Sequence, residues 1–208
     1  MSEQLMGVRE ELLARTEGRT LLDVFAATCD ANWNRPALVI KEGDGFRTLT
    51  WGEYRTQASH VAMALRGYGV RHGDHVALMM TNRPEHVVAD VGALMAGGVP
   101  VSVYNTLATD QIRYIAENCA AKVAILEDAA FLATWDAVRE QLPALEVLVV
   151  VDPTGVDVDG RDDVITYAEL LERGERALET GHGELENSWR GVTPDDAVTL
   201  IYTSGTTG

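Results

Sequence analysis

The fold is decided by residues 75–104, which read HVALMMTNRPEHVVADVGALMAGGVPVSVY. One apolar run opens this stretch at His75–Met80, and another closes it at Val99–Tyr104. Between them, at about 83–97, the apolar residues have helical spacing, and Pro84 suits a first turn because proline has no N–H to leave unbonded. A continuous run such as VALMM (76–80) is typical of a strand in a parallel sheet whose two faces are covered by helices. We therefore expect a strand, a helix and a second strand here.

The same alternation continues downstream of this stretch. Strands are expected at 122–127 and 146–151, and helices at about 109–120 and 128–141, with Asn82, Thr109 and Asp128 as N-cap residues. Strand starts recur about every 24 residues, but the segments share no residue pattern, so the spacing reflects the length of a β-α unit rather than a repeat. These elements predict an α/β fold, a doubly wound and largely parallel sheet with helices on both faces.

The N-terminal part has a different character. Residues 1–19 are polar and aperiodic, which predicts a loose leader before a domain that spans 20–208. A helix is expected from about Thr20 to Ala31, followed by a β-hairpin whose strands, 37–41 and 47–50, flank the Gly43-Asp44-Gly45 turn. Thr50 and Glu53 then have the T-x-x-E spacing of a capping box, which predicts the start of a further helix.

Composition restricts the classes of partner. The 208 residues contain 32 acids and 17 bases, giving a formal net charge of −15, while 46% of the residues are hydrophobic. Enough apolar material is present for a sizeable core. The charge argues against nucleic acid or an anionic membrane as the main partner, because both present phosphate groups that would repel the chain.

Targeting signals and cysteine usage point to the cytoplasm. The N-terminus lacks the apolar segment of a signal peptide, and the longest apolar run, 87–104, is broken by Asp90, Gly97, Gly98 and Pro100. No transmembrane segment is therefore expected. Cys29 and Cys119 are far apart in sequence and are expected to be reduced, with Cys119 buried on the apolar stripe of its helix.

Acidic residues concentrate between Asp152 and Asp196. The stretch contains thirteen acidic residues and only four arginines. The spacing of its apolar residues predicts one helix, with Tyr167, Leu170, Leu171 and Leu178 on one face. The acids do not recur at the spacing of metal ligands, so we expect a solvated surface excursion. His72 and His75 have H-x-x-H spacing but no further ligand pair nearby, and no metal site is expected.

The final residues carry the strongest chemical signal. An apolar strand expected at Ala197–Tyr202 leads into Thr203-Ser204-Gly205-Thr206-Thr207-Gly208. Glycines let consecutive N–H groups point at one anion and hydroxyls add further donors, so such a loop suits phosphate. No G-x-x-x-x-G-K-[ST] sequence exists in the chain, which excludes the ATPase type of phosphate loop. From the chemistry alone, a flexible polar terminus fits equally well.

The stretch YTSGTTG (202–208) is similar to the phosphate-binding signature of the AMP-forming adenylating enzymes, a superfamily of acyl-CoA synthetases, luciferases and peptide-synthetase adenylation domains. The chain resembles this superfamily from about Thr20 to its end, including LTWGEY (49–54) and the long stretch from Gly69 to Asp128. PVSVYNT followed by QIRYIAENCAAKVAILED looks most like the fatty-acyl-CoA synthetases. On this resemblance, residues 20–208 are the N-terminal part of an AMP-binding domain, ending within its phosphate-binding loop.

The resemblance implies a two-step reaction. A carboxylate attacks the α-phosphate of ATP·Mg, giving an acyl-adenylate and pyrophosphate, and the thiol of CoA then displaces AMP. Thr203, Ser204, Gly205, Thr206 and Thr207 would hold the β- and γ-phosphates, with Gly208 supplying the turn. The substrate would be a fatty acid or another small carboxylate.

The chain departs from the family pattern after the loop. In family members, the adenine-binding segment, the magnesium-coordinating glutamate and the catalytic lysine come later in the chain, so no catalytic or metal-binding residue is expected within these 208 residues. We therefore expect no adenylation by this chain alone, and no tight binding of ATP, Mg²⁺ or CoA. The alternatives are a non-catalytic or split-gene module whose C-terminal half is encoded separately, or another carboxylate-activating member such as an aryl-CoA or acyl-AMP ligase.

Overall fold

The computed structural model describes residues 3–203. Its elements are, in chain order, α1 (Glu3–Thr16), α2 (Leu21–Asn32), β1 (Pro36–Glu42), β2 (Gly45–Thr50), α3 (Trp51–Gly67), β3 (His75–Met79), α4 (Pro84–Met95), β4 (Val99–Ser102), α5 (Thr109–Asn118), β5 (Val123–Leu126), α6 (Ala129–Asp136), the 3₁₀ turn η1 (Arg139–Gln141), β6 (Val147–Val150), β7 (Val164–Thr166) and α7 (Tyr167–Arg190). The alternation of strands and helices predicted for the middle of the chain is confirmed.

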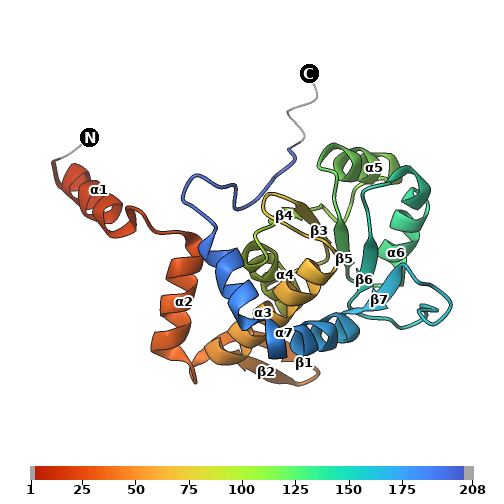
Figure 1. The fold of residues 1–208 in the computed structure, drawn as a ribbon, viewed down its shortest axis with the longest axis horizontal. Helices are drawn as coiled ribbons and strands as arrows, with labels where there is room; N and C mark the ends of the chain where they lie inside the picture. The colour runs from red at the N-terminus through yellow and green to blue at the C-terminus, as the bar shows by residue number, and fades with distance from the viewer. Residues whose placement is uncertain (1–2, 204–208) are drawn as a thin grey trace.

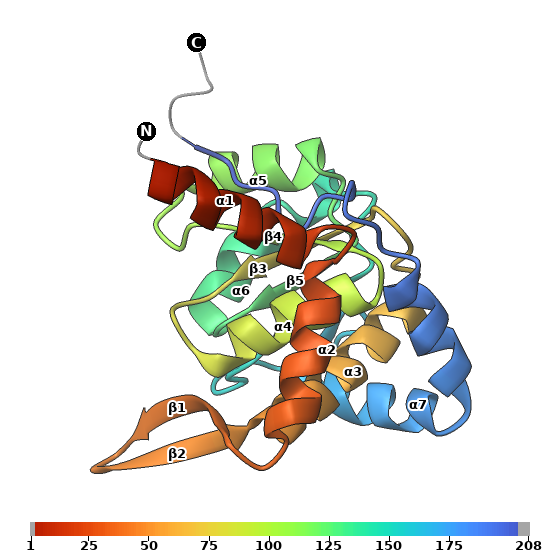
Figure 2. The ribbon, with the colours of Figure 1, turned by 90° about the vertical axis from the view of Figure 1, so that its left-hand side faces the viewer.

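A five-stranded sheet with all its strands parallel forms the centre, in the order β4-β3-β5-β6-β7. Helices α2, α3, α4 and α7 lie over one face, and α5 and α6 lie over the other (Figures 1 and 2). Alternate residues of each strand point to opposite faces, so Val76 and Leu78 join the first core while Ala77 and Met79 join the second. The doubly wound α/β fold expected from the sequence is therefore confirmed.

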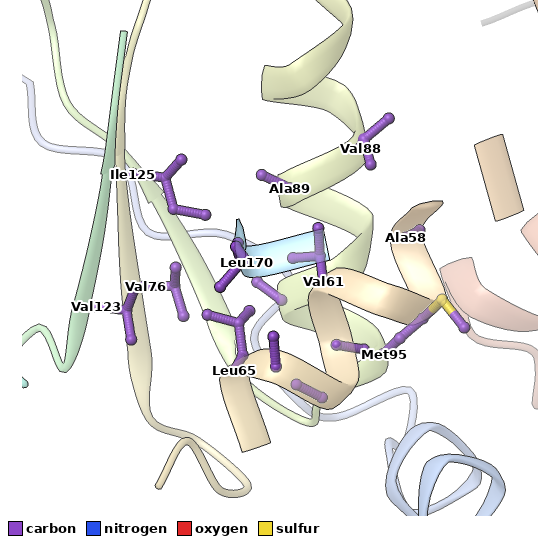
Figure 3. Close-up of a cluster of buried hydrophobic side chains, with 14 of the residues drawn as sticks. Ala58, Val61, Leu65, Val76, Val88, Ala89, Met95, Val123, Ile125 and Leu170 are labelled. Carbon is purple, nitrogen blue, oxygen red and sulfur yellow. The ribbon is translucent and has the colours of Figure 1, made fainter. Parts of the chain in front are cut away.

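The larger core lies between the sheet and the first group of helices. Figure 3 shows Val61 and Leu65 of α3, Ala89 of α4 and Leu170 of α7 facing the strand residue Ile125. All five side chains are fully buried. Burial of apolar side chains at this scale supplies most of the stabilisation of the layer.

The hairpin and the capping box form as predicted. β1 and β2 pair antiparallel around Gly43, which has a φ of +59°. Thr50 Oγ1 accepts a hydrogen bond from the N–H of Glu53 (3.2 Å), and the Glu53 carboxylate accepts one from the N–H of Thr50 (2.7 Å). Two of the unpaired N–H groups at the start of α3 are satisfied in this way.

Two of the three predicted N-caps are wrong. Asp128 caps α6, but Arg83 rather than Asn82 precedes α4, because Pro84 takes the N1 position. Ala108 rather than Thr109 precedes α5, because the side chain of Gln111 accepts a hydrogen bond from the N–H of Ala108 (3.0 Å).

The prediction for the N-terminal leader also needs correction. Residues expected to lack regular structure form α1, whose described side chains are exposed and which projects from the body of the molecule (Figure 1). Its sequence is rich in Glu, Leu and Arg, which favour a helix through local hydrogen bonds even where no apolar face is buried.

The acidic stretch 152–196 is not a solvated excursion throughout. It contains β7, which joins the sheet beside β6, and α7, whose Leu170 is fully buried. At Gly174 a Cβ atom would overlap the carbonyl oxygen of His60, so the absence of a side chain lets α7 approach α3 closely. The acids occupy the outer side of α7, which is why composition alone suggests a solvated segment.

The buried position predicted for Cys119 is confirmed, and Cys29 is buried as well; neither is in a disulfide. Within residues 3–203, no helix has both the length and the apolar character needed to cross a bilayer.

Candidate functional site

The order of the strands places a topological switch point at the carboxyl edge of the sheet. The chain passes from β3 to β4 on one side and then to β5 on the other side of β3, so the loops that leave β3 and β5 diverge. Ligands of open parallel sheets bind outside the carboxyl ends of the strands at such a point. Here Glu127, directly after β5, accepts hydrogen bonds from the N–H and the hydroxyl of Thr81.

The positively charged side chain of Arg83 lies at this switch point, but two carboxylates already contact it. Arg83 Nε donates to Glu85 Oε2 (2.8 Å), and Arg83 Nη1 lies 3.5 Å from Glu127 Oε1. A groove of about 490 Å³ between β1 and the first turn of α4 adjoins this arginine. A phosphate here would have to compete with two carboxylates, so these residues fix the two loops rather than offer a free anion site.

A cavity of about 640 Å³ lies at the opposite, amino edge of the sheet, lined in part by Arg66, Arg71 and His72. Arg66 is paired with Glu184 (2.7 Å) and donates to the carbonyl oxygen of Ala96. Arg71 donates to the carbonyl oxygens of residues 66 and 70 near the end of α3. Both guanidinium groups therefore satisfy helix ends, where the negative pole of the helix disfavours a bound anion.

The residues predicted to bind phosphate begin beside β4. Leu200 forms a parallel bridge with Val101, and its N–H donates to the carbonyl oxygen of Pro100 (3.2 Å). Since the bridge is parallel, the chain runs toward the carboxyl edge from Leu200 onward. Thr203 is the only predicted phosphate-binding residue inside the described part of the chain; Ser204, Gly205, Thr206, Thr207 and Gly208 lie outside it.

The strand expected at Ala197–Tyr202 is reduced to this single bridge within the described residues. The segment lies along the outer edge of β4, and no second strand flanks it in the part of the chain that the structure describes. The expectation of a full strand is therefore wrong, while the direction of the segment agrees with it.

Two side chains attach this segment to the rest of the domain. The hydroxyl of Tyr202 donates to Asn118 Oδ1 at the end of α5 (2.7 Å), and burial raises the pKa of that phenol. Asp196 Oδ2 accepts from the N–H (2.7 Å) and the hydroxyl (2.9 Å) of Thr193, and Asp196 Oδ1 lies 3.0 Å from His72 Nε2. These hydrogen bonds, chiefly the one from the Thr193 N–H, hold the pKa of Asp196 below its ordinary value.

Sequence reasoning missed the partners in both attachments. The H-x-x-H spacing of His72 and His75 is not expected to form a metal site, and it gives no sign of the contact between His72 and Asp196 that the structure shows. The spacing of Thr193-Pro194-Asp195-Asp196 is that of a β-turn with proline at its second position, so the turn could have been found from the sequence. Its contact with His72 spans 124 positions and has no local signal.

Comparison with known proteins gives one family match and several relatives. The family described as AMP-binding enzyme matches residues 25–208. An uncharacterized protein of Mycobacterium tuberculosis is 38% identical over 144 residues, which are 69% of this chain and 79% of that protein. The long-chain-fatty-acid–CoA ligase ACSBG2 of Xenopus laevis is 29% identical over 189 residues, 91% of this chain and 25% of the ligase.

A solved structure shares the fold. The crystal structure of the anthranilate CoA ligase AuaEII in complex with anthranoyl-AMP superposes with a TM-score of 0.65 at 25% identity, over 74% of this chain and 28% of that one. The chain thus spans about a quarter of the length of the ligases that it matches, but most of the length of the mycobacterial protein.

Proposed function

Because the chain belongs to the AMP-binding enzyme family, we propose that it supplies the N-terminal, phosphate-binding part of an adenylating domain that activates fatty acids. The proposed domain spans residues 20–208, and the family match over 25–208 supports this boundary. Curated relatives matched over most of this chain are long-chain-fatty-acid–CoA ligases of Xenopus laevis and Drosophila melanogaster, which supports the choice of substrate class.

The proposed reaction is that of a fatty-acid–CoA ligase. The fatty-acid carboxylate attacks the α-phosphorus of MgATP, the bond to the bridging oxygen breaks, and pyrophosphate leaves. The CoA thiolate then attacks the acyl carbon of the adenylate, releasing AMP and giving the thioester. In the first step, negative charge moves onto the leaving pyrophosphate, so hydrogen-bond donors fixed around its oxygens lower the barrier.

The proposed task of Thr203–Gly208 is to provide those donors for the β- and γ-phosphates. The observation that carries the proposal is the parallel bridge between Leu200 and Val101, since it directs the described residues that precede the proposed loop toward the carboxyl edge of the sheet. Within residues 3–203, no three His, Cys, Asp or Glu side chains come together as a metal site. Mg²⁺ therefore enters the proposal only as part of the MgATP substrate.

Binding of pyrophosphate to the purified chain tests this assignment. Line broadening of the pyrophosphate signal in ³¹P NMR is expected with the wild-type chain, and it should be lost in Gly205→Ala and Thr206→Val, which remove backbone freedom and a hydroxyl donor. Thr199→Val, placed before the loop, is the matched control and should broaden the signal like wild type. Equal broadening with all the variants would contradict the phosphate role of the loop.

The same preparation tests the expectation that the chain alone is not a ligase. Incubation with MgATP and a fatty acid should give no acyl-adenylate, because we propose that the remaining site residues are supplied by other polypeptide. Formation of fatty-acyl-AMP by the purified chain would refute that expectation.

A second candidate is a short module that acts without catalysis or with a separately encoded partner half. The mycobacterial relative favours this candidate, because the match covers 69% of this chain and 79% of that protein, so the two chains are similar in length. The intact mass of the native protein, detected with an antibody to this chain, separates the two. A band at 22.6 kDa would support the module. A band several times larger would support a complete synthetase.

The substrate class has its own alternative. The fold match to an anthranilate CoA ligase favours an aryl carboxylate as the competing substrate. Competition between long-chain fatty acids and anthranilate for adenylation, measured on the native enzyme, would decide between them.

A further inference from the structure

The connection between α7 and Thr203 is held at three points, which are Asp196, Leu200 and Tyr202. At the first, Thr193 and Asp196 close a turn reciprocally, since the N–H of Asp196 also donates to the carbonyl oxygen of Thr193 (3.1 Å). The two bonds from Thr193 use Oδ2 of Asp196, which leaves Oδ1 for His72. Because an ionised carboxylate only accepts hydrogen bonds, His72 donates through a protonated Nε2.

His72 is itself held in place. It lies in the turn before β3, where the N–H of Arg71 donates to Asp74 Oδ2 (2.7 Å) and the N–H of Gly73 donates to the carbonyl oxygen of Gly97 (2.9 Å). Gly97 has a φ of +85°, and a Cβ there would lie 3.5 Å from the Cα of His72. The imidazole therefore projects from a turn fixed to the sheet, and the turn at Asp196 is attached to that sheet through it.

The other two points lie nearer to the loop. The N–H of Leu200 reaches Pro100 of the edge strand, and the hydroxyl of Tyr202 reaches Asn118 on the opposite side of the sheet from α4. The three points use three different parts of the domain, namely the turn before β3, the strand β4 and the end of α5. A segment held by separate elements at three positions within seven residues has little freedom to rotate about its own axis.

We propose that Asp196 and Tyr202 are positioning residues that set the entry of the phosphate loop at the carboxyl edge of the sheet, with His72 and Asn118 as their supports. The inference rests on the proposed function of the loop. It adds that the loop entry is fixed by contacts made entirely within this chain, before any downstream residue is involved.

Amide hydrogen exchange at Leu200, followed by NMR on the full chain, tests the proposal. Asp196→Ala should raise the exchange rate of this amide about tenfold, as the loss of a charge-assisted hydrogen bond implies. Asp195→Ala, which removes the neighbouring exposed carboxylate, is the matched control and should leave the rate unchanged. The amide of Ile125 in the core should keep its protection in both variants, so that a local effect is separated from a general loss of stability.

Substitutions of His72 provide an independent test of the proposal. His72→Ala should raise the Leu200 exchange rate as Asp196→Ala does, whereas His72→Gln, which keeps an N–H donor at a similar reach, should restore most of the protection. Tyr202→Phe, which removes only the hydroxyl, should also raise the exchange rate of the Leu200 amide. The proposal is overturned if Asp196→Ala and His72→Ala leave the exchange of Leu200 within about twofold of wild type, or raise that of Ile125 equally.

Pyrophosphate binding separates this inference from the function on which it rests. If the wild-type chain binds pyrophosphate, Asp196→Ala should weaken binding in proportion to the loss of protection at Leu200, while Asp195→Ala should not. If the wild-type chain does not bind pyrophosphate, the proposed function fails, and the exchange data alone still decide whether Asp196 and Tyr202 fix the segment.

Discussion

Asp90 is a half-buried carboxylate in the middle of α4, and its removal should stabilise the protein at neutral pH. Burial raises the pKa of Asp90 to about 6, and the same charge contributes to raising the pKa of Tyr54 on α3. No hydrogen bond or ion pair from the described residues compensates the carboxylate. Asp90→Asn keeps the size of the side chain and removes only the charge that is penalised.

The size of the expected stabilisation follows from the difference between the pKa of the Asp90 carboxyl in the folded protein and its ordinary value. A pKa of about 6 in the folded protein against the ordinary 3.8 corresponds to roughly 3 kcal/mol of penalty on the charged form. Partial exposure of the side chain to solvent lowers this penalty, so Asp90→Asn is expected to increase the free energy of unfolding by about 1–2 kcal/mol at pH 8. Because the folded pKa is raised, the folded state binds more protons, and the wild-type protein loses stability as the pH rises from about 4 through about 6.

Urea denaturation followed by tryptophan fluorescence measures the effect, since Trp135 is fully buried in the second core. The gain from Asp90→Asn should be largest at pH 8 and fall to about half at pH 5, where the folded carboxyl of the wild type is mostly protonated. Asp44→Asn, in the exposed turn of the hairpin, is the matched control and should change little at either pH. The reasoning is refuted if Asp90→Asn is no more stable than wild type at pH 8, or if its advantage grows as the pH falls.

Substitutions at Gly174, Leu170 and Thr50 test the packing of α7 and the cap of α3. Gly174→Ala should destabilise the protein by about 2–3 kcal/mol in thermal melts, because its methyl group would overlap the carbonyl oxygen of His60; Gly183→Ala, on the same helix with open space around it, should be neutral or stabilising. A melt in which both variants behave alike would contradict the close contact of α7 with α3. Leu170→Ala should cost about 2–5 kcal/mol in urea denaturation, and a cost under 1 kcal/mol would mean that α7 is not part of the core. Thr50→Ala should cost about 1 kcal/mol by the same assay through loss of the capping box, and Thr50→Ser should recover most of it.

Three of the corrected elements, β7, α7 and the segment at Leu200, share one property, which is that their pairing or burial depends on contacts far along the chain. β7 is three residues long and has no periodicity to identify it, so its pairing with β6 is its only signal. The apolar face of α7 predicts a helix, but the burial of that helix depends on the match between Gly174 and His60 across 114 positions. The segment at Leu200 is apolar enough for a strand, but within the described residues it is joined to β4 by a single bridge, with Val101 about 100 positions earlier in the chain.

The sequence by itself determined the alternation of strands and helices from His75 to Val150, the hairpin, the capping box at Thr50 and the resemblance of Tyr202–Gly208 to a phosphate-binding signature. Each of these features depends on residues that are close together in the sequence, because periodicity, turn chemistry and side-chain caps act locally. The tertiary structure alone decided the order of the strands, the burial of α7, and the pairing of Asp196 with His72 and of Tyr202 with Asn118. The two side-chain pairings join residues 84 or more positions apart, so they arise only when the packed layers bring the two partners together.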